Sequence, residues 1–260
     1  MSLLTWILVF SLAGGVASVL AAAAFMFAAD RWQARLLPHL VSFAIGALLG
    51  AAFLALLPHA FAGADEATVH RLGLAVLLGL LGFFLLEKTV LWRHCHAADC
   101  EAHAPAPDAP AQPAAGILVL VGDAVHNLVD GVLIAAAFMT DVHLGIVTAL
   151  AVAAHEIPQE VGDFAVLLHS GFSRRRALFY NVLSSLTTVA GAVAAWYGLA
   201  GVRAVLPYVL AVAAASFIYI AVADLIPGLH RRLEWRATLQ QISLILLGVG
   251  VIFAAHSTLH

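Results

Sequence analysis

Long apolar stretches alternate with short polar connections along the whole chain. Each stretch has about 20 residues or more, which is enough to cross a hydrocarbon core of about 30 Å as a helix. The pattern therefore predicts eight membrane-spanning helices, whose ends are placed to within several residues. The predicted spans are Leu3–Phe27, Pro38–Phe61, Leu72–Trp92, Ala114–Met139, His143–His169, Arg176–Leu199, Ala204–Leu229 and Thr238–Ser257.

The composition agrees with a chain that lies in a lipid bilayer. Of the 260 residues, 63% are hydrophobic and 10% are charged, and the mean hydropathy is +1.00. A soluble domain carries about a quarter charged residues, so we exclude a water-soluble enzyme and predict one integral membrane domain over residues 1–260. The net charge of −3 and the scattered basic residues do not favour a nucleic-acid partner.

Basic residues set the predicted orientation, because Lys and Arg gather on the cytoplasmic side of a membrane. With the N-terminus outside, ten of the twelve basic residues face the cytoplasm. Both termini are then outside, and the Ala- and Pro-rich stretch 93–113 is a flexible cytoplasmic loop. The excess of Arg over Lys and the short loops favour the plasma membrane of a prokaryote. The inward-facing residues are Arg31, Arg35, Lys88, Arg93, Arg174, Arg175, Arg176, Arg231, Arg232 and Arg236.

Polar residues interrupt the fourth and fifth spans. In the fourth span His126 and Asp130 are four residues apart and share a helix face, with Asp123 one turn below and Asn127 beside them. The fifth span carries two adjacent rows at four-residue spacing. One row is His155, Gln159 and Asp163, and the other is Glu156 and Glu160.

Both histidines lie near the middle of the bilayer. His126 and His155 each follow the first residue of their predicted span by 12 residues, which is about 18 Å along a helix. The two spans run in opposite directions, so their polar sets meet at one level, as in inverted repeats with a site at the midplane. An ionisable group there costs about 2.5–3.5 kcal/mol, so the acids need compensation by a proton or by a metal cation.

Imidazole, carboxylate and carboxamide groups together suit a borderline divalent cation such as Zn²⁺, with Fe²⁺ or Mn²⁺ as alternatives. Pro158 removes a backbone donor and is expected to open the helix beside the site. Gly131 and Gly162 are expected to let helices approach closely. We expect His126, Asp130 and His155 to bind the ion, with Gln159 completing the site. The full set of candidate ligands is His126, Asn127, Asp130, His155, Glu156, Gln159, Glu160 and Asp163.

Further candidate ligands lie nearer the ends of the spans and in the cytoplasmic loop. His59 and His256 fall near the outer ends of the second and eighth spans, and Asp224 falls near the inner end of the seventh. The loop offers five soft or borderline ligands within ten residues without zinc-finger spacing, so it is either a plain linker or a weak chelator at the exit. The candidate entrance and exit residues are His59, Asp123, Asp224, His94, Cys95, His96, Cys100 and His103.

Two other functions fit parts of this pattern. The run from His155 to Gln159 is one residue from the HExxH motif of metalloproteases, although the second histidine of the motif is Gln159 here. Acids and histidines could also form a proton relay in a carrier of a small organic substrate. A membrane scaffold would leave the buried acids unexplained.

The segments DAVHNLVDGVLIAAAF and HEIPQEVGDFAVLL resemble the ZIP (Zrt-, Irt-like) family of divalent metal transporters, in its LIV-type subfamily. LLPHAF, FFLLEK and YIAVADLIP extend the similarity over most of the chain. The resemblance implies eight helices in a 3+2+3 inverted-repeat arrangement, both termini outside, and a metal site between helices four and five. It also implies uptake of Zn²⁺, with Fe²⁺, Mn²⁺ or Cd²⁺ as further substrates, toward the cytoplasm. No cofactor is implied, and a homodimer is left open.

The family patterns transfer residue by residue with one departure. The pattern on helix four falls on His126, Asn127 and Asp130, and the pattern on helix five begins at His155. The subfamily usually has a second histidine where this chain has Gln159, and a carboxamide oxygen is a weaker and harder ligand for zinc than imidazole. Some members hold a second, adjacent metal ion, which here implies Asn127 and Glu156 with Glu160 or Asp163.

Overall fold

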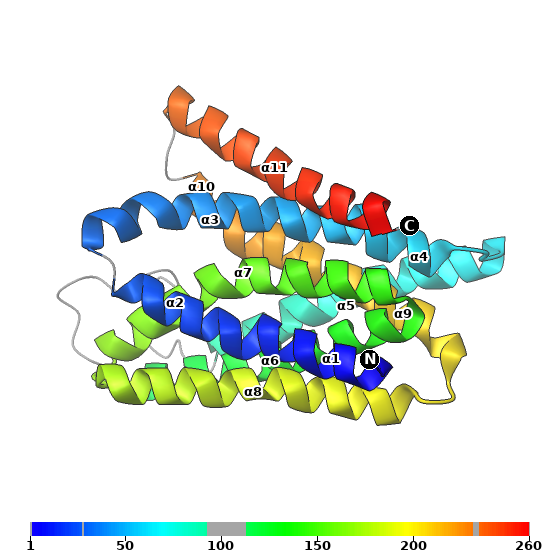
Figure 1. The fold of residues 1–260 in the computed structure, drawn as a ribbon, viewed down its shortest axis with the longest axis horizontal. Coiled ribbons are helices and arrows are strands. Elements are labelled where there is room, and N and C mark those ends of the chain that lie inside the picture. Colours follow the sequence, from blue (N-terminus) through cyan, green and yellow to red (C-terminus); the bar gives the residue numbers. More distant parts are fainter. Residues whose placement is uncertain (1, 28, 93–112, 231–233, 260) are drawn as a thin grey trace.

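The structure is a computed structural model that describes residues 2–27, 29–92, 113–230 and 234–259. Within these ranges all regular secondary structure is helical, and each of the eight predicted spans corresponds to one helical segment (Figure 1). The predicted cytoplasmic loop, with His94, Cys95, His96, Cys100 and His103, lies outside the described residues. The helices are α1 (Leu3–Leu12), α2 (Ser18–Met26), α3 (Asp30–Ala51), α4 (Leu57–Phe61), α5 (Glu66–Trp92), α6 (Pro113–Thr140), α7 (Val142–His169), α8 (Arg174–Leu199), α9 (Leu206–Tyr219), α10 (Ile226–Leu229) and α11 (Trp235–Leu259).

Three spans contain a π-helical turn between two α-helices. η1 (Ala13–Ala17) joins α1 to α2, η2 (Ala52–Leu56) joins α3 to α4, and η4 (Ile220–Leu225) joins α9 to α10. After η2 and η4 the second residue of the next helix is a proline, which has no N–H to continue the ladder. These two turns lie in the middle members of the first three and the last three spans, and this supports the predicted repeat.

Seven of the eight spans are long and apolar enough to cross a membrane among the residues described, and the exception is α7. Half of the 28 residues of α7 are buried, and it packs against α2, α3, α6, α8 and α11. In Figure 1 it runs through the middle of the bundle. By contrast, 11% of the apolar window is buried in α5 and in α11. The polar residues of α7 are therefore tolerated because this helix faces protein rather than lipid.

α6 and α8 pack with their backbones in contact. A Cβ atom added to Gly131 would lie 1.8 Å from the carbonyl oxygen of Thr188, and one added to Gly191 would lie 2.0 Å from that of Leu128. Glycine at both positions therefore sets the spacing of these helices, as expected for Gly131. The same expectation for Gly162 is wrong, because a Cβ there would meet nothing within 4 Å.

α3 and α11 form a second pair of this kind. A Cβ added to Gly46 would lie 2.0 Å from the carbonyl oxygen of Ile245, and one added to Gly248 would lie 2.3 Å from that of Phe43. The two glycine-mediated contacts hold α6 to α8 and α3 to α11 as units.

One residue, Asp141, links α6 to α7 and fixes the start of α7. Its Oδ1 accepts hydrogen bonds from the backbone N–H of His143 at 2.8 Å and of Leu144 at 3.0 Å, which caps the helix. The short link makes α6 and α7 antiparallel neighbours. α7 then continues as one helix through Pro158 to His169, so the expected opening at Pro158 does not break it.

Both chain ends lie at the same end of the bundle (Figure 1). An even number of spans requires this arrangement. α5 begins at that same end after Asp65, whose carboxylate accepts a hydrogen bond from the backbone of Thr68 at 2.9 Å. Hydrogen bonding to Thr68 holds the pKa of Asp65 below its usual value.

Candidate metal site

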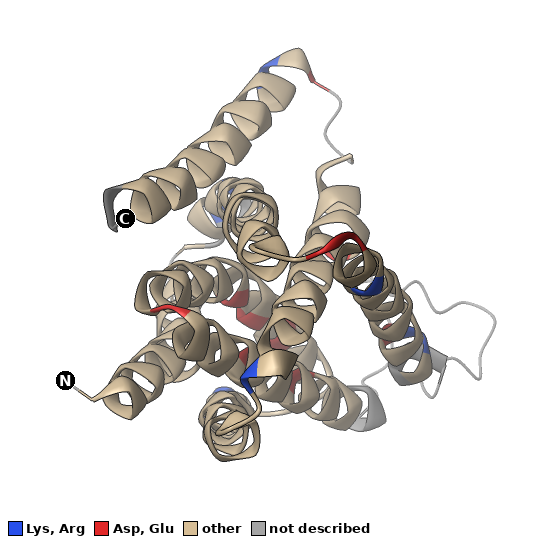
Figure 2. Ribbon diagram, turned by 90° about the vertical axis from the view of Figure 1, so that its right-hand side faces the viewer, with Lys and Arg blue, Asp and Glu red and all other residues tan. Residues whose placement is uncertain are grey.

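α6 and α7 bring two histidines and two acids together at the middle of the bundle. His126 and Asp130 project from α6, and His155 and Glu156 project from α7. His126 and His155 each lie 13 residues after the first residue of their helix, so the antiparallel pairing sets them at one level, as predicted. Figure 2 shows acidic segments among the helices in the interior of the bundle.

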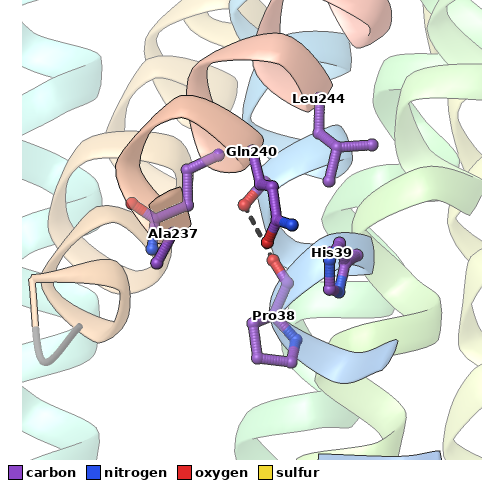
Figure 3. A pocket seen from close by; sticks show the side chains of 7 residues that line it. Pro38, His39, Ala237, Gln240 and Leu244 are labelled. Carbon is purple, nitrogen blue, oxygen red and sulfur yellow. Dashed lines mark hydrogen bonds between the residues drawn. The ribbon is translucent and has the colours of Figure 1, made fainter. Parts of the chain in front are cut away.

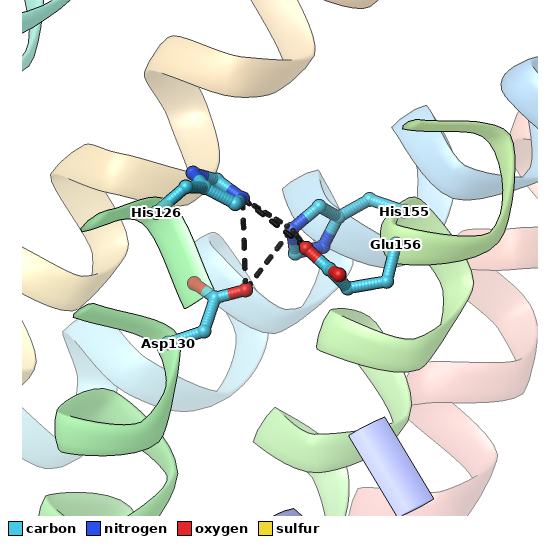
Figure 4. A group of neighbouring side chains, drawn as sticks. All are labelled: His126, Asp130, His155 and Glu156. Carbon is cyan, nitrogen blue, oxygen red and sulfur yellow. Dashed lines mark hydrogen bonds and ion pairs between the residues drawn. The ribbon is translucent and has the colours of Figure 1, made fainter. Parts of the chain in front are cut away.

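The ligand atoms of the four side chains have the spacing of a tetrahedral zinc site (Figure 4). The Nε2 atoms of His126 and His155 are 3.2 Å apart. Asp130 Oδ2 lies 3.7 Å from the first and 3.2 Å from the second, and Glu156 Oε1 lies 3.4 Å and 3.7 Å from them. Donors that bind one tetrahedral ion at 2.0–2.1 Å are about 3.3–3.4 Å apart, so these atoms could share a single cation.

A backbone contact orients the His155 ring. Its Nδ1 lies 3.0 Å from the carbonyl oxygen of Ala151, and because a carbonyl only accepts, Nδ1 carries the proton. Nε2 then keeps its lone pair and points to the other three side chains. This is the arrangement that metal-binding histidines adopt in proteins.

The acids of this cluster are buried without hydrogen bonds. Asp130 and Glu156 are each 0% exposed, and none of their four carboxylate oxygens has a hydrogen-bond partner among the described residues. Buried ionised carboxylates are stable only when a cation or a proton compensates them. The cluster therefore has both the geometry and the charge to hold a divalent ion.

A second group of acids adjoins the first. Carboxylate oxygens of Asp123, Glu156 and Glu160 all lie within 4.8 Å of one another, and all three residues are buried. Glu156 belongs to both groups. An ion could thus pass from a site with two imidazoles to a site of carboxylates alone without leaving Glu156.

Side chains of helix α8 hold Asp123 and Asn127 of α6 in place by hydrogen bonds. Thr188 donates to Asn127 Oδ1 at 2.6 Å, Asn127 Nδ2 donates to Asp123 Oδ1 at 2.8 Å, and Ser184 donates to Asp123 Oδ2. The carboxamide oxygen of Asn127 thus accepts from Thr188, although we expected it to face a metal ion. Sequence analysis missed the role of α8, for which the four-residue spacing of Ser184 and Thr188 was the available signal.

The remaining predicted residues lie elsewhere in the described structure. Gln159 and Asp163 are half-buried on α7, and Gln159 makes no hydrogen bond there with another described residue. The fourth side chain that meets the two histidines and Asp130 belongs to Glu156. Asp224 is exposed in η4, while His59 and His256 meet at one end of the bundle.

A small pocket between α3 and α11 is separate from this site (Figure 3). Its lining contains none of the predicted metal ligands. The lining residues are Pro38, His39, Ser42, Ala237, Gln240, Gln241 and Leu244.

A helical membrane protein with a buried cluster of side chains that could bind a metal ion, halfway along its helices, has the architecture of a metal-ion transporter. The sequence profile described as "ZIP Zinc transporter" matches residues 2–106 and 93–255. The chain therefore belongs to the ZIP zinc transporter family, which confirms the resemblance. Because this is a family of transporters rather than enzymes, the metalloprotease alternative is set aside.

Named relatives agree with this assignment. Zinc transporter ZIP13 of Mus musculus is 33% identical over 263 residues, covering 86% of this chain and 70% of the relative. Zinc transporter ZIP4 of Mus musculus is 45% identical over 115 residues, covering 43% of this chain and 17% of the relative. Zinc transporter ZIP10 of Danio rerio is 38% identical over 142 residues, with 52% and 17% covered.

Proposed function

We propose that the protein carries divalent transition-metal ions, principally Zn²⁺, across a membrane toward the cytoplasm. The observation that carries this proposal is the close meeting of His126, Asp130, His155 and Glu156, whose buried carboxylates have no hydrogen-bond partner among the described residues. Imidazole with carboxylate suits Zn²⁺, and Fe²⁺, Mn²⁺ and Cd²⁺ are further substrates on the same chemistry.

In this proposal the ion leaves the central site through acidic residues on the cytoplasmic side of the two histidines. With the termini outside, α6 runs outward and α7 runs inward, so Asp123 and Glu160 lie on the cytoplasmic side of the two histidines. Asp163, half-buried one turn further along α7, continues that direction, and Asp224 is a further exit residue. Oxygen ligands bind zinc less strongly than imidazole does, so this order of ligands favours release.

Two carboxamides are auxiliary ligands in this proposal. Gln159 follows His155 by one turn, and a change of side-chain rotamer would bring its oxygen toward the ion. Asn127 retains one lone pair on Oδ1 beyond the bond from Thr188. Both carboxamide oxygens are harder ligands than imidazole, so they would shift the preference of the site toward harder ions relative to a site with a third imidazole.

The wider setting follows from sequence alone. We propose the LIV-type subfamily, a single membrane domain over residues 1–260, the plasma membrane of a prokaryote, and a homodimer as the assembly. The loop at residues 93–113 would act as a weak cytoplasmic chelator through His94, Cys95, His96, Cys100 and His103.

Uptake into proteoliposomes tests the function directly. Purified protein should give time-dependent accumulation of Zn²⁺ in a panel with Fe²⁺, Mn²⁺ and Cd²⁺, and His126→Ala with His155→Ala should abolish it. His70→Ala, on the exposed face of α5, is the matched control and should transport normally. Uptake by the double variant at the rate of the unmodified protein would refute the proposed site.

A further inference from the structure

One face of α8 presents three polar side chains to the interior of the bundle. Asn181, Ser184 and Thr188 follow one another at spacings of three and four residues, so they share a helix face, and all three are buried. Thr188 donates to Asn127 and Ser184 donates to Asp123. With the termini outside, α8 runs outward like α6, so Asn181 lies at the cytoplasmic end of this row.

Asn181 differs from the other two residues because its acceptor atom is unused. Its side chain is buried at 1% exposure, and its Oδ1 has no hydrogen-bond partner among the described residues. The side chain lies beside the carboxylate of Glu160, which is 0% exposed and likewise has two oxygens without a hydrogen-bond partner there. Oxygen atoms of both side chains are acceptors, so a cation is the partner that both can share.

Glu160 also belongs to the second group of acids, with Asp123 and Glu156, whose carboxylate oxygens lie within 4.8 Å of one another. Hydrogen bonds from Asn127 and Ser184 orient the Asp123 carboxylate in that group. The group contains no imidazole, and Asn181 would add a neutral oxygen to its three carboxylates. Oxygen ligands suit harder divalent ions such as Mn²⁺ better than imidazole does.

We propose that Asn181 is a further ligand of an oxygen-only binding position for a divalent cation, which it forms with the second group of acids. A carboxamide adds no charge to this position. The number of charged ligands is one of the features that set the affinity of an oxygen site, so the ion is released more readily than it would be from four carboxylates. The role of Asn181 in release rests on the proposed function, whereas its role as a ligand can be measured without transport.

Binding of Mn²⁺ to the purified full-length protein in detergent, followed by electron paramagnetic resonance, tests the ligand. Asn181→Leu removes the oxygen at similar volume and should raise the Kd for Mn²⁺ by about tenfold or more. Asn181→Asp has the same size, keeps an oxygen and loses the N–H donors, so it should bind Mn²⁺ at least as tightly as the unmodified protein. Ser185→Ala is the matched control on α8, because the Ser185 hydroxyl donates to its own helix at the carbonyl of Val182.

Two results of this comparison would overturn the proposal. In one, Asn181→Leu binds Mn²⁺ as tightly as the unmodified protein and Ser185→Ala. In the other, Asn181→Asp binds as weakly as Asn181→Leu, which would assign to Asn181 the role of an N–H donor to Glu160 instead of a ligand.

A measurement on the unmodified chain covers the case in which the variants do not fold. The chain contains two asparagines, Asn127 and Asn181, so ¹³C labelling of asparagine gives two side-chain carboxamide signals in nuclear magnetic resonance spectra. Additional labelling of tyrosine identifies the second of them through its neighbour Tyr180. Saturation with Zn²⁺ should shift the carboxamide carbon of Asn181, and an unchanged signal would contradict coordination by its oxygen.

Removal of the two imidazoles separates this proposal from the proposed function. In a His126→Ala, His155→Ala background the oxygen-only position should still bind Mn²⁺, and Asn181→Leu should still raise the Kd. Loss of that dependence on Asn181 counts against the ligand. Retained uptake in the same background counts against the proposed function alone.

Discussion

The Nε2 atoms of His126 and His155 lie 3.2 Å apart, although the two residues belong to different helices. Nδ1 of His155 is engaged by the backbone, so the lone pair of its Nε2 faces another nitrogen and two carboxylates. A single cation at their centre would satisfy all four groups at once.

Removing the charge of Asp130 should separate folding from zinc binding. In Asp130→Asn the free energy of unfolding without metal should stay the same or rise, because a buried charge without hydrogen bonds is removed. Stabilisation by zinc should shrink from about 2.7 kcal/mol at a concentration 100 times the Kd. Thermal melting in detergent, with and without Zn²⁺, measures both effects. An unchanged zinc-induced shift would contradict the assignment, and Asp65→Asn, outside the site, is the control.

The hydrogen bond from α8 should matter for metal affinity. Thr188→Val removes the donor to Asn127 and frees the amide that holds Asp123. Loss of such a supporting contact lowers metal affinity by about 10–100-fold, which titration calorimetry with Zn²⁺ would show. Thr187→Val is the matched control, because Thr187 donates to the backbone carbonyl of Ala124 instead. Equal losses in both variants would assign the effect to general disturbance of α8.

The close contact of α6 with α8 should not tolerate a methyl group. Gly191→Ala places a Cβ 2.0 Å from the carbonyl oxygen of Leu128, and overpacking of this kind costs about 1–3 kcal/mol or more. The melting temperature and the Zn²⁺ affinity should both fall. Gly198→Ala lies on the same helix with open space around it and should melt like the unmodified protein. A stable Gly191→Ala would mean that the helices can separate without cost.

Substitution of Gln159 should change ion preference. Gln159→His provides the softer imidazole ligand, so uptake of Zn²⁺ should increase relative to uptake of Mn²⁺. Competition between the two ions in proteoliposomes measures the ratio. If the ratio does not change, the side chain at position 159 does not reach the ion, and Glu156 alone supplies the fourth ligand.

The sequence predicted the spans and the central pair of helices because both depend on periodicity. Apolar stretches longer than a bilayer identify spans directly, and four-residue spacing places His126 with Asp130 on one face whatever the neighbours are. His126 and His155 lie at the same depth because each lies the same number of residues after the start of its helix. The single-residue link at Asp141 keeps the two helices side by side, so this equality holds in the structure.

The identity of the fourth ligand could not be predicted in this way. Glu156 and Gln159 border the same face of α7, and which one meets the histidines depends on the rotation of α7 about its axis. That rotation is set by packing against several helices at once. The use of the Asn127 oxygen by Thr188, and the meeting of His59 with His256, likewise depend on contacts between residues far apart in sequence.

The polarity of α7 has a consequence for how the protein enters its membrane. Insertion of a helix by the translocon costs about 2.5–3.5 kcal/mol for each acidic residue near the centre of the helix, and α7 has several. α7 therefore cannot partition into lipid as an independent segment. The link through Asp141 joins it to α6, which is apolar enough to cross. We expect the two to enter as a hairpin, and α7 to stay sheltered beside the translocon until α8 emerges from the ribosome.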